Sequence, residues 1–205
     1  MTAPTRPLTP VAALFVRADS IYKTLPGVDC WDAERDARKW PGGCPVVAHP
    51  PCRTWGHLKA FATKAPLDEH SMGPWAVCQV RTWGGVLEHP KGSSLFRSCG
   101  CPAPSHPPDE FGGWTMEVDQ FHWGHKARKR TWLYIVGTAN VPPEPRRNGA
   151  PTHCVGRPGG KRKPNQIPCC THDEREKTPP AFAEWLVALA RKCQPAQGEP
   201  DAKED

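Results

Sequence analysis

Short apolar runs that end in turns are the main hydrophobic pattern of this chain. Val11–Val16, Val46–Ala48 and Val86–Leu87 are nearly continuous apolar segments, which is typical of strands buried on both faces. Between the last two runs, apolar residues recur at helical spacing over Gly73–Trp83, which predicts a helix that connects the two strands. Strand, helix and strand in alternation predict an α/β fold with a mainly parallel sheet.

The C-terminal half predicts an antiparallel pair of strands and then a helix. Trp114–Phe121 alternates apolar and polar residues, and Thr131–Val136 is rich in β-forming residues and stops at Gly137. The short connection between these segments favours a hairpin. Apolar residues at positions 182, 185, 186, 189, 190 and 193 then share one face of a helix that opens at Thr178-Pro-Pro180.

Basic residues are concentrated in one segment. The formal net charge is +6, and between His122 and Lys163 ten Lys and Arg residues stand against one acid, Glu144. Aromatic residues such as Trp123 and Trp132 are interleaved with these cations. Cations that neutralise phosphates and rings that stack on bases suit nucleic acid, so we expect DNA as the partner. The alternative is a solvated, charged loop.

The chain shows no sign of a membrane or export segment. No apolar run approaches the length of a membrane helix, and the N-terminus lacks the apolar stretch of a signal peptide. We therefore expect a cytoplasmic protein without a membrane partner. Ten Cys and nine His are many for 205 residues. In a reducing compartment such thiols serve as buried apolar groups, metal ligands or nucleophiles.

Two reactive side chains follow predicted strands. His49-Pro-Pro-Cys52 comes directly after one strand, and Glu88-His-Pro90 forms an expected turn after another. Reactive groups gather at the carboxyl ends of parallel strands in open α/β sheets. A thiol reacts as its thiolate, so Cys52 needs a cationic setting, which Arg53, His49 and the basic segment offer. The alternative is that Cys52 is structural.

Four short motifs extend this pattern. They are His49-Pro-Pro-Cys52, Val86-Leu-Glu88-His-Pro90, Trp123-Gly-His-Lys-Ala-Arg128-Lys-Arg130 and Thr178-Pro-Pro-Ala-Phe-Ala-Glu-Trp185. In this order, over residues 44–192, they resemble the motifs of the DNA cytosine-5 methyltransferases. The resemblance implies a Rossmann-like methyltransferase fold, with a mainly parallel sheet and a C-terminal antiparallel hairpin. Residues 138–177 stand in place of the family's large target-recognition domain, as a miniature recognition region.

The resemblance assigns catalytic roles to four residues. Cys52 matches the family's nucleophile, Glu88 matches the glutamate of its Glu-Asn-Val motif, and Arg128 and Arg130 overlay the arginines of Gln-x-Arg-x-Arg. A thiolate that adds to C6 of a pyrimidine makes C5 reactive, while a carboxyl offsets charge at N3 and arginines stabilise charge at O2. We therefore predict a DNA-modifying enzyme that acts at C5 of a pyrimidine, cytosine by resemblance, through a covalent Cys52 adduct.

The methyl-donor loop departs from the family pattern. The family's Phe-x-Gly-x-Gly loop approaches S-adenosylmethionine, but Phe15-Val-Arg-Ala-Asp-Ser20 contains no glycine, so Cβ atoms and the Arg17 side chain would crowd the donor. Asp32 either binds a ribose or caps a turn. The resemblance assigns cofactor binding to Phe15, Asp32, Thr178 and Pro179. Two alternatives stay open: a different one-carbon donor or an already modified base, and a non-catalytic, zinc-containing DNA-binding module.

The region 138–177 also contains candidate ligands for zinc and for DNA phosphates. His and Cys residues there suggest a zinc knuckle, although their spacing matches no standard finger and buried or free thiols remain the alternative. The zinc ligands would be His153, Cys154, Cys169, Cys170 and His172. We expect DNA phosphates to contact Arg53, Lys126, Arg146, Arg147, Lys161, Arg162 and Lys163.

The domain organisation follows from these assignments. We expect a flexible lead over residues 1–10 and a catalytic α/β core over 11–137. A basic Pro- and Gly-rich DNA-binding loop region would follow over 138–177. A C-terminal helix over 178–193 would pack on the core, and a disordered tail would occupy 194–205.

Overall fold

The computed structural model describes residues 8–56, 59, 65–156 and 167–195. Its centre is a six-stranded sheet in the order β2-β1-β3-β4-β6-β5. The strands are β1 (Val11–Leu14), β2 (Val28–Trp31), β3 (Val46–Ala48), β4 (Gly85–Pro90), β5 (Trp114–Asp119) and β6 (Arg130–Val136). Strands β1 to β4 run parallel, whereas β6 runs antiparallel to both β4 and β5. The predicted α/β class, mainly parallel sheet and antiparallel C-terminal pair are confirmed.

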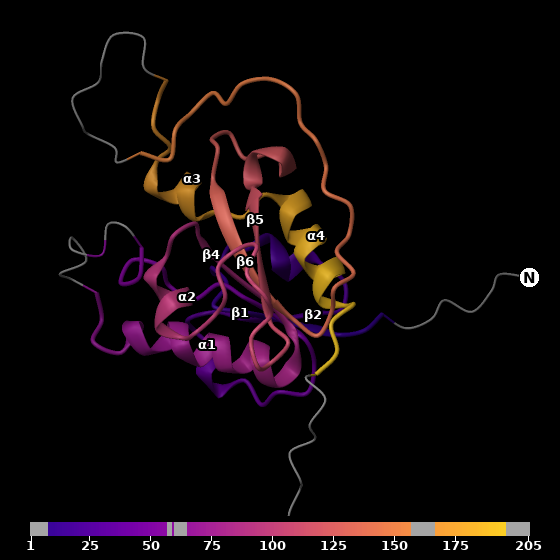
Figure 1. The fold of residues 1–205 in the computed structure, drawn as a ribbon. Helices are drawn as coiled ribbons and strands as arrows, with labels where there is room; N and C mark the ends of the chain where they lie inside the picture. The colour runs from indigo at the N-terminus through magenta and orange to yellow at the C-terminus, as the bar shows by residue number, and fades with distance from the viewer. Residues whose placement is uncertain (1–7, 57–58, 60–64, 157–166, 196–205) are drawn as a thin grey trace, which may run out of the picture.

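Helices cover both faces of this sheet. They are α1 (Glu69–Trp83), α2 (Ser94–Ser98), α3 (His172–Glu176) and α4 (Pro180–Ala190), with the short 3-10 helices η1 (Ile21–Thr24), η2 (Ala37–Lys39) and η4 (Gln120–Trp123). Figure 1 shows α1 and α2 on one side of the sheet and α4 on the other. The helices expected over 73–83 and after Thr178 are confirmed, although α1 begins earlier, at Glu69.

Alternate residues of the central strands supply two cores. In β1, Val11 and Ala13 pack with α4, whereas Ala12 and Leu14 pack with α1. All four are fully buried. Because side chains alternate across a strand, a strand covered on both faces is apolar at every position. This explains the continuous apolar run that predicts β1.

Glu88 lies inside a strand, not in the turn expected after it. β4 continues to Pro90 because β6 runs beside it, with Glu88 opposite Leu133 and Pro90 opposite Thr131. Glutamate and proline have low strand propensity, so the local pattern ends this strand too early. The prediction of a turn over Glu88–Pro90 was wrong because a partner distant in sequence supplies the pairing.

Helix α3 lies inside the region 138–177, for which the sequence predicts only loop. A capping box joins Thr171 and Glu174, each of whose side chains accepts a hydrogen bond from the other's backbone amide. None of the residues of α3 is buried. A helix without a buried face has no apolar period, so the hydrophobic pattern cannot reveal it.

The chain between β6 and α3 forms an extended strap, residues 138–156, which runs past α4 (orange in Figure 1). The Trp185 indole on α4 donates to the carbonyls of Pro142 (3.2 Å) and Pro143 (3.1 Å), which fixes the strap to the helix. The expected lead and tail fall mostly on residues 1–7 and 196–205, outside the described residues. Gln194, at the start of that tail, donates its amide to Gly137 (3.0 Å). Among the described helices, none is long and apolar enough to cross a membrane.

Candidate active site at the ends of the parallel strands

Glu88 is the centre of a hydrogen-bonded chain that spans several elements. Its Oε2 lies 3.0 Å from Nδ1 of His49, which directly follows β3. Its Oε1 accepts from the Gln120 amide of η4 at 3.1 Å, and the same amide lies 2.9 Å from the Thr131 hydroxyl of β6. The side chains of Glu88 and His49 are each only 13% exposed. The carboxylate is therefore held on both oxygens in a largely buried place.

The chain continues from His49 to Tyr22. Tyr22 on η1 is buried, and its hydroxyl lies 2.9 Å from Nε2 of His49. Burial, followed by the negative charge of Glu88, raises the pKa of Tyr22 well above its usual value, so the hydroxyl keeps its proton. All three groups are satisfied when Tyr22 donates to Nε2 and the Nδ1–H of His49 donates to Glu88.

Glu88 is ionised in this setting. Burial opposes the charge, but the hydrogen bond from His49 and the positive charge of Lys129 outweigh it and lower the pKa of Glu88 to about 2. The neighbouring His89 is fully buried, and burial lowers its pKa to about 4, so its imidazole is neutral. Neighbouring residues of a strand point to opposite faces, so the ionised carboxylate of Glu88 and the neutral imidazole of His89 lie on opposite faces of β4.

Cys52 sits in a tight turn beyond β3. Its carbonyl accepts from the amides of Trp55 (3.1 Å) and Gly56 (2.8 Å), and its side chain is exposed to solvent. Arg53 binds the buried carboxylate of Glu69 on α1, with Nε at 2.7 Å from Oε1, which anchors the turn. Arg53 is thus already paired within the protein, although the sequence predicts that it contacts DNA.

The charges around Cys52 act in opposite directions. The protein surrounding the thiol, and then the negative charge of Glu88, raise the pKa of Cys52, whereas the positive charge of Lys129 lowers it. Cys52 follows β3 and Glu88 lies in the adjacent strand β4, joined to the turn of Cys52 by the contact between Glu88 and His49. In the absence of a bound ligand, the balance favours the thiol over the thiolate.

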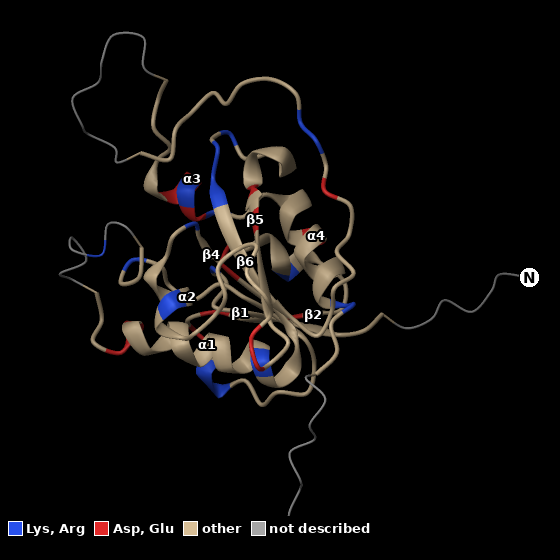
Figure 2. Cartoon of the chain, viewed as in Figure 1, with Lys and Arg blue, Asp and Glu red and all other residues tan. Residues whose placement is uncertain are grey.

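Arg128 and Arg130 have other partners. Arg128 forms an ion pair with Asp119 (3.1 Å) and Arg130 with Glu117, and both arginine side chains are more than half exposed. The residue whose charge acts on Cys52 and Glu88 is Lys129, between them. Figure 2 shows the basic segment before β6 beside acidic residues of β5 and α3. Sequence reasoning missed Lys129 because the motif match selects its neighbours.

The segment after β1 is tied to α3. Phe15 takes a left-handed conformation with φ of 59°, in a turn where the family has a loop with glycines. Arg17 pairs with Asp19 (2.8 Å), Asp173 (2.7 Å) and Glu176 (2.8 Å). The guanidinium is therefore directed to carboxylates, two of them on α3.

Asp32 and Pro179, which the resemblance also matches to the donor site, have partners within the protein. Asp32 is buried, binds Nζ of Lys23 at 2.6 Å and accepts the backbone amides of Glu34 and Arg35 at 3.1 Å each, so it caps a turn. Pro179 accepts from the first turn of α4, and Thr178 precedes it. With Asp32 and Arg17 engaged in this way, these residues do not fit an open S-adenosylmethionine site, and we derive no step through that donor.

The predicted zinc ligands come together only in part. Cys154 and Cys169 have their sulfurs 3.0 Å apart, and Cys170 is buried with its amide bonded to the Cys154 carbonyl (2.9 Å). His153 lies 2.9 Å from the Thr152 hydroxyl, and the His172 side chain is 76% exposed. Within the described residues, no group of three or more Cys, His, Asp or Glu side chains is arranged to hold a metal ion.

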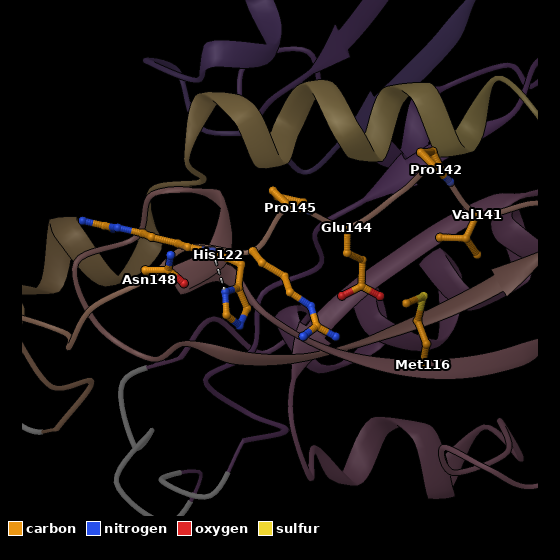
Figure 3. Close-up of a pocket in the computed structure, with 9 residues that line it drawn as sticks. Met116, His122, Val141, Pro142, Glu144, Pro145 and Asn148 are labelled. Atoms are coloured by element: carbon orange, nitrogen blue, oxygen red, sulfur yellow. Dashed lines mark hydrogen bonds between the residues drawn. The ribbon is translucent and has the colours of Figure 1, made fainter.

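Basic residues of the strap border a pocket of about 710 Å³. Figure 3 shows Met116 of β5 and His122 of η4 facing strap residues such as Glu144 and Asn148 across it. Its lining also includes Arg146 and Arg147. The guanidinium of Arg147 lies over the Phe121 ring at 4.6 Å, and Lys126 pairs with Glu174. Lys161, Arg162 and Lys163 lie outside the described residues.

Comparison of the chain with protein-family models, with curated proteins and with solved structures found no match. The resemblance to the cytosine-5 methyltransferases therefore rests on the four sequence motifs alone. Function has to be argued from the chemistry of Cys52, Glu88 and the side chains around them.

Proposed function

We propose that this protein is a DNA-modifying enzyme that acts at C5 of a pyrimidine base through a covalent bond to Cys52. The observation that carries the proposal is that Glu88 of β4, ionised and held on both oxygens, binds His49, which lies three residues before Cys52 on the turn after the adjacent strand β3. A thiol nucleophile and a fixed carboxylate at one sheet edge are the groups that this addition chemistry needs.

The sheet topology and the location of the four motifs support the same proposal. Strand β6 lies between β4 and β5 and closes the sheet with antiparallel pairing, in agreement with the hairpin that the resemblance implies. Three of the four motifs contribute to the region around Glu88, and the fourth opens α4, which packs on the same face of the sheet. We therefore infer a Rossmann-like fold of the methyltransferase type, reduced in size.

The proposed reaction begins when the Cys52 thiol gives its proton to water. Sγ then bonds to C6 of the base, the π electrons of the C5–C6 bond move into the ring, and N3 takes up a proton from water, with the Glu88 carboxylate accepting the hydrogen bond of the new N3–H. The product is an enamine whose C5 is nucleophilic. C5 attacks a one-carbon electrophile, which loses its leaving group. Loss of the C5 and N3 protons then restores the double bond as the C6–S bond breaks and the thiolate leaves.

The one-carbon electrophile in this proposal is a compound other than S-adenosylmethionine. The Asp32 carboxylate is already bonded to Lys23 and to backbone amides, and Arg17 ties the loop after β1 to α3. A different one-carbon donor therefore accounts better for these residues. DNA as the substrate polymer is supported by the basic strap and by the basic segment before β6, because both can neutralise phosphates.

A zinc-containing DNA-binding module without catalysis is the second candidate. The nearness of Cys154 and Cys169 favours it, since two thiols at one place are half of a common zinc site. It leaves the Tyr22–His49–Glu88–Gln120 chain without a role, which is why the enzyme is preferred.

Mass spectrometry of nucleosides from the DNA of cells that express the protein tests the proposal whichever donor the enzyme uses. We expect a C5-modified pyrimidine nucleoside whose added mass identifies the transferred group. Cys52→Ser should abolish it, whereas Cys78→Ser, at an exposed cysteine of α1, should not. Absence of any modified nucleoside, together with normal DNA binding, would favour the binding module.

A further inference from the structure

The basic segment 126–130 contains four cations, and three of them are neutralised by the protein itself. Lys126 pairs with Glu174, Arg128 with Asp119 and Arg130 with Glu117. Within the part of the chain that the structure describes, Lys129 alone of these cations forms no ion pair. The positive charge of Lys129 is therefore not neutralised by these acidic residues and can act on other groups.

The strand register directs Lys129 to the reactive site. The backbone carbonyl of Lys129 accepts from the backbone amide of Gln120 at 3.1 Å and from the Thr131 hydroxyl at 3.2 Å. Gln120 in turn binds Glu88 through its side chain. Residues 131 and 133 of β6 share one face because side chains alternate, and Leu133 lies directly opposite Glu88. Lys129 continues this register just before the strand, since its carbonyl accepts the backbone amide of Gln120. Arg130 begins β6 on the opposite face, where it pairs with Glu117, whereas Arg128 precedes the strand and pairs with Asp119.

We propose that Lys129 is a positioning residue whose positive charge stabilises the Cys52 thiolate and the Glu88 carboxylate as a reactive pair. This inference rests on the proposed function for its purpose, but its physical content concerns the free protein. Without Lys129, an anionic thiolate would form beside an anionic carboxylate with no neighbouring cation to offset either. The motif match assigns the role of stabilising cation to Arg128 and Arg130, whereas the geometry assigns this role to Lys129, the residue between them.

The direction of the electrostatic effects supports the assignment. Lys129 lowers the pKa of Cys52 and also that of Glu88, while Glu88 raises the pKa of Cys52. An uncompensated charge in the neighbourhood of a titrating group near a protein surface changes its ionisation equilibrium by about three- to tenfold. The change is large enough to measure as a change in thiol reactivity.

Alkylation of the free protein by iodoacetamide across a range of pH tests this directly, because only the thiolate reacts. Peptide mass spectrometry separates Cys52 from the other cysteines, including Cys44 on the same tryptic peptide. We expect Lys129→Met to slow the alkylation of Cys52 about three- to tenfold at a pH below its pKa, and to move the profile to higher pH. Lys129→Arg should restore most of the wild-type profile, since it keeps the charge.

Arg128→Met is the matched control, since it removes a neighbouring cation that is paired with Asp119. It should leave the Cys52 profile unchanged. A wild-type profile in Lys129→Met, or an equal shift in Arg128→Met, would overturn the assignment. Thermal denaturation of each variant identifies misfolding, and Lys129→Arg provides the result if Lys129→Met is unstable. The experiment needs neither DNA nor a donor, so failure of the proposed reaction and failure of this inference are distinguishable.

Discussion

Nδ1 of His49 lies 3.0 Å from Oε2 of Glu88, and this contact joins the end of β3 to β4 at the place where Cys52 is presented. His49 precedes Cys52 by three residues on the same turn. The contact therefore does two things at once: it fixes the orientation of the carboxylate and it attaches the turn that carries the thiol. Both groups would lose their relative position if His49 were replaced.

Replacement of Glu88 by glutamine should change Cys52 in the direction opposite to loss of Lys129. The amide keeps the size of the side chain but removes the negative charge that raises the pKa of Cys52. We expect alkylation of Cys52 in Glu88→Gln to be about three- to tenfold faster than in the wild type at a pH below its pKa. Turnover on DNA should nevertheless fall, because the carboxylate that holds the proton at N3 of the base is lost. An unchanged alkylation profile would show that the two side chains do not interact.

The stability of the protein in acid should depend on Glu88. Its pKa lies at about 2 in the folded state against an ordinary value of 4.5. A lowered pKa stabilises the fold above the ordinary value, and this contribution is lost as the pH falls from about 4.5 towards 2. Urea denaturation at pH 6 and pH 3 should therefore show a smaller acid-induced loss of unfolding free energy in Glu88→Gln, by about 1–3 kcal/mol.

The control for that measurement is Glu184→Gln, at an exposed position of α4. It should lose as much stability between the two pH values as the wild type. Equal acid sensitivity in Glu88→Gln and the wild type would mean that the Glu88 carboxylate is not stabilised by His49 and Lys129 as described.

The parts of the fold that could be predicted are those with a local signal. β1 and β3 are apolar at every position because both faces are covered, and α4 has a complete apolar face. By contrast, α3 depends on a capping box and on ion pairs with Arg17, neither of which produces a hydrophobic period. The sequence singles out Cys52 and Glu88 as candidates because each follows a short apolar run that predicts a strand.

Residues that reach the site through distant pairing could not be found in this way. Tyr22 and Gln120 contact His49 and Glu88 across long separations in sequence. The choice of Lys129 over its arginine neighbours depends on the register of β6 against β4, which no local pattern reports. A motif match gives the order of the residues but not the face on which each one lies.

DNA binding should depend on salt through the strap. Because each phosphate contact contributes to the slope of log affinity against log salt, the double variant Arg146→Ala/Arg147→Ala should bind more weakly, with a slope smaller by about 1–2. Lys39→Ala, on η2 and outside the basic segment, should leave the slope unchanged. Fluorescence anisotropy with a labelled DNA duplex at several salt concentrations measures the affinity and its slope against salt for each variant. An unchanged slope in the double variant would show that DNA contacts another surface.

S-adenosylmethionine should bind the free protein weakly or not at all. Asp32 is buried and already accepts three hydrogen bonds, one from Lys23 and two from the turn amides, so little of its carboxylate is left for a ribose. The loop after β1 cannot open without breaking the pairs of Arg17 with Asp173 and Glu176. Isothermal titration calorimetry, with and without DNA, should therefore show no sub-micromolar binding to the free protein.

The Arg17→Ala variant distinguishes, in the calorimetric titration, between the effect of the Arg17 ion pairs and the effect of the Asp32 hydrogen bonds. It releases the loop from α3 but leaves Asp32 bonded to Lys23, so we expect the affinity for S-adenosylmethionine to remain low. A gain in affinity in this variant would mean that the loop alone blocks the donor. Sub-micromolar binding to the wild type would show that the Asp32 turn and the Arg17 pairs rearrange at little cost, and would make the protein an ordinary methyltransferase. If binding appears only with DNA, the polymer itself opens the loop, because the ordering cost is then met by contacts that the free protein lacks.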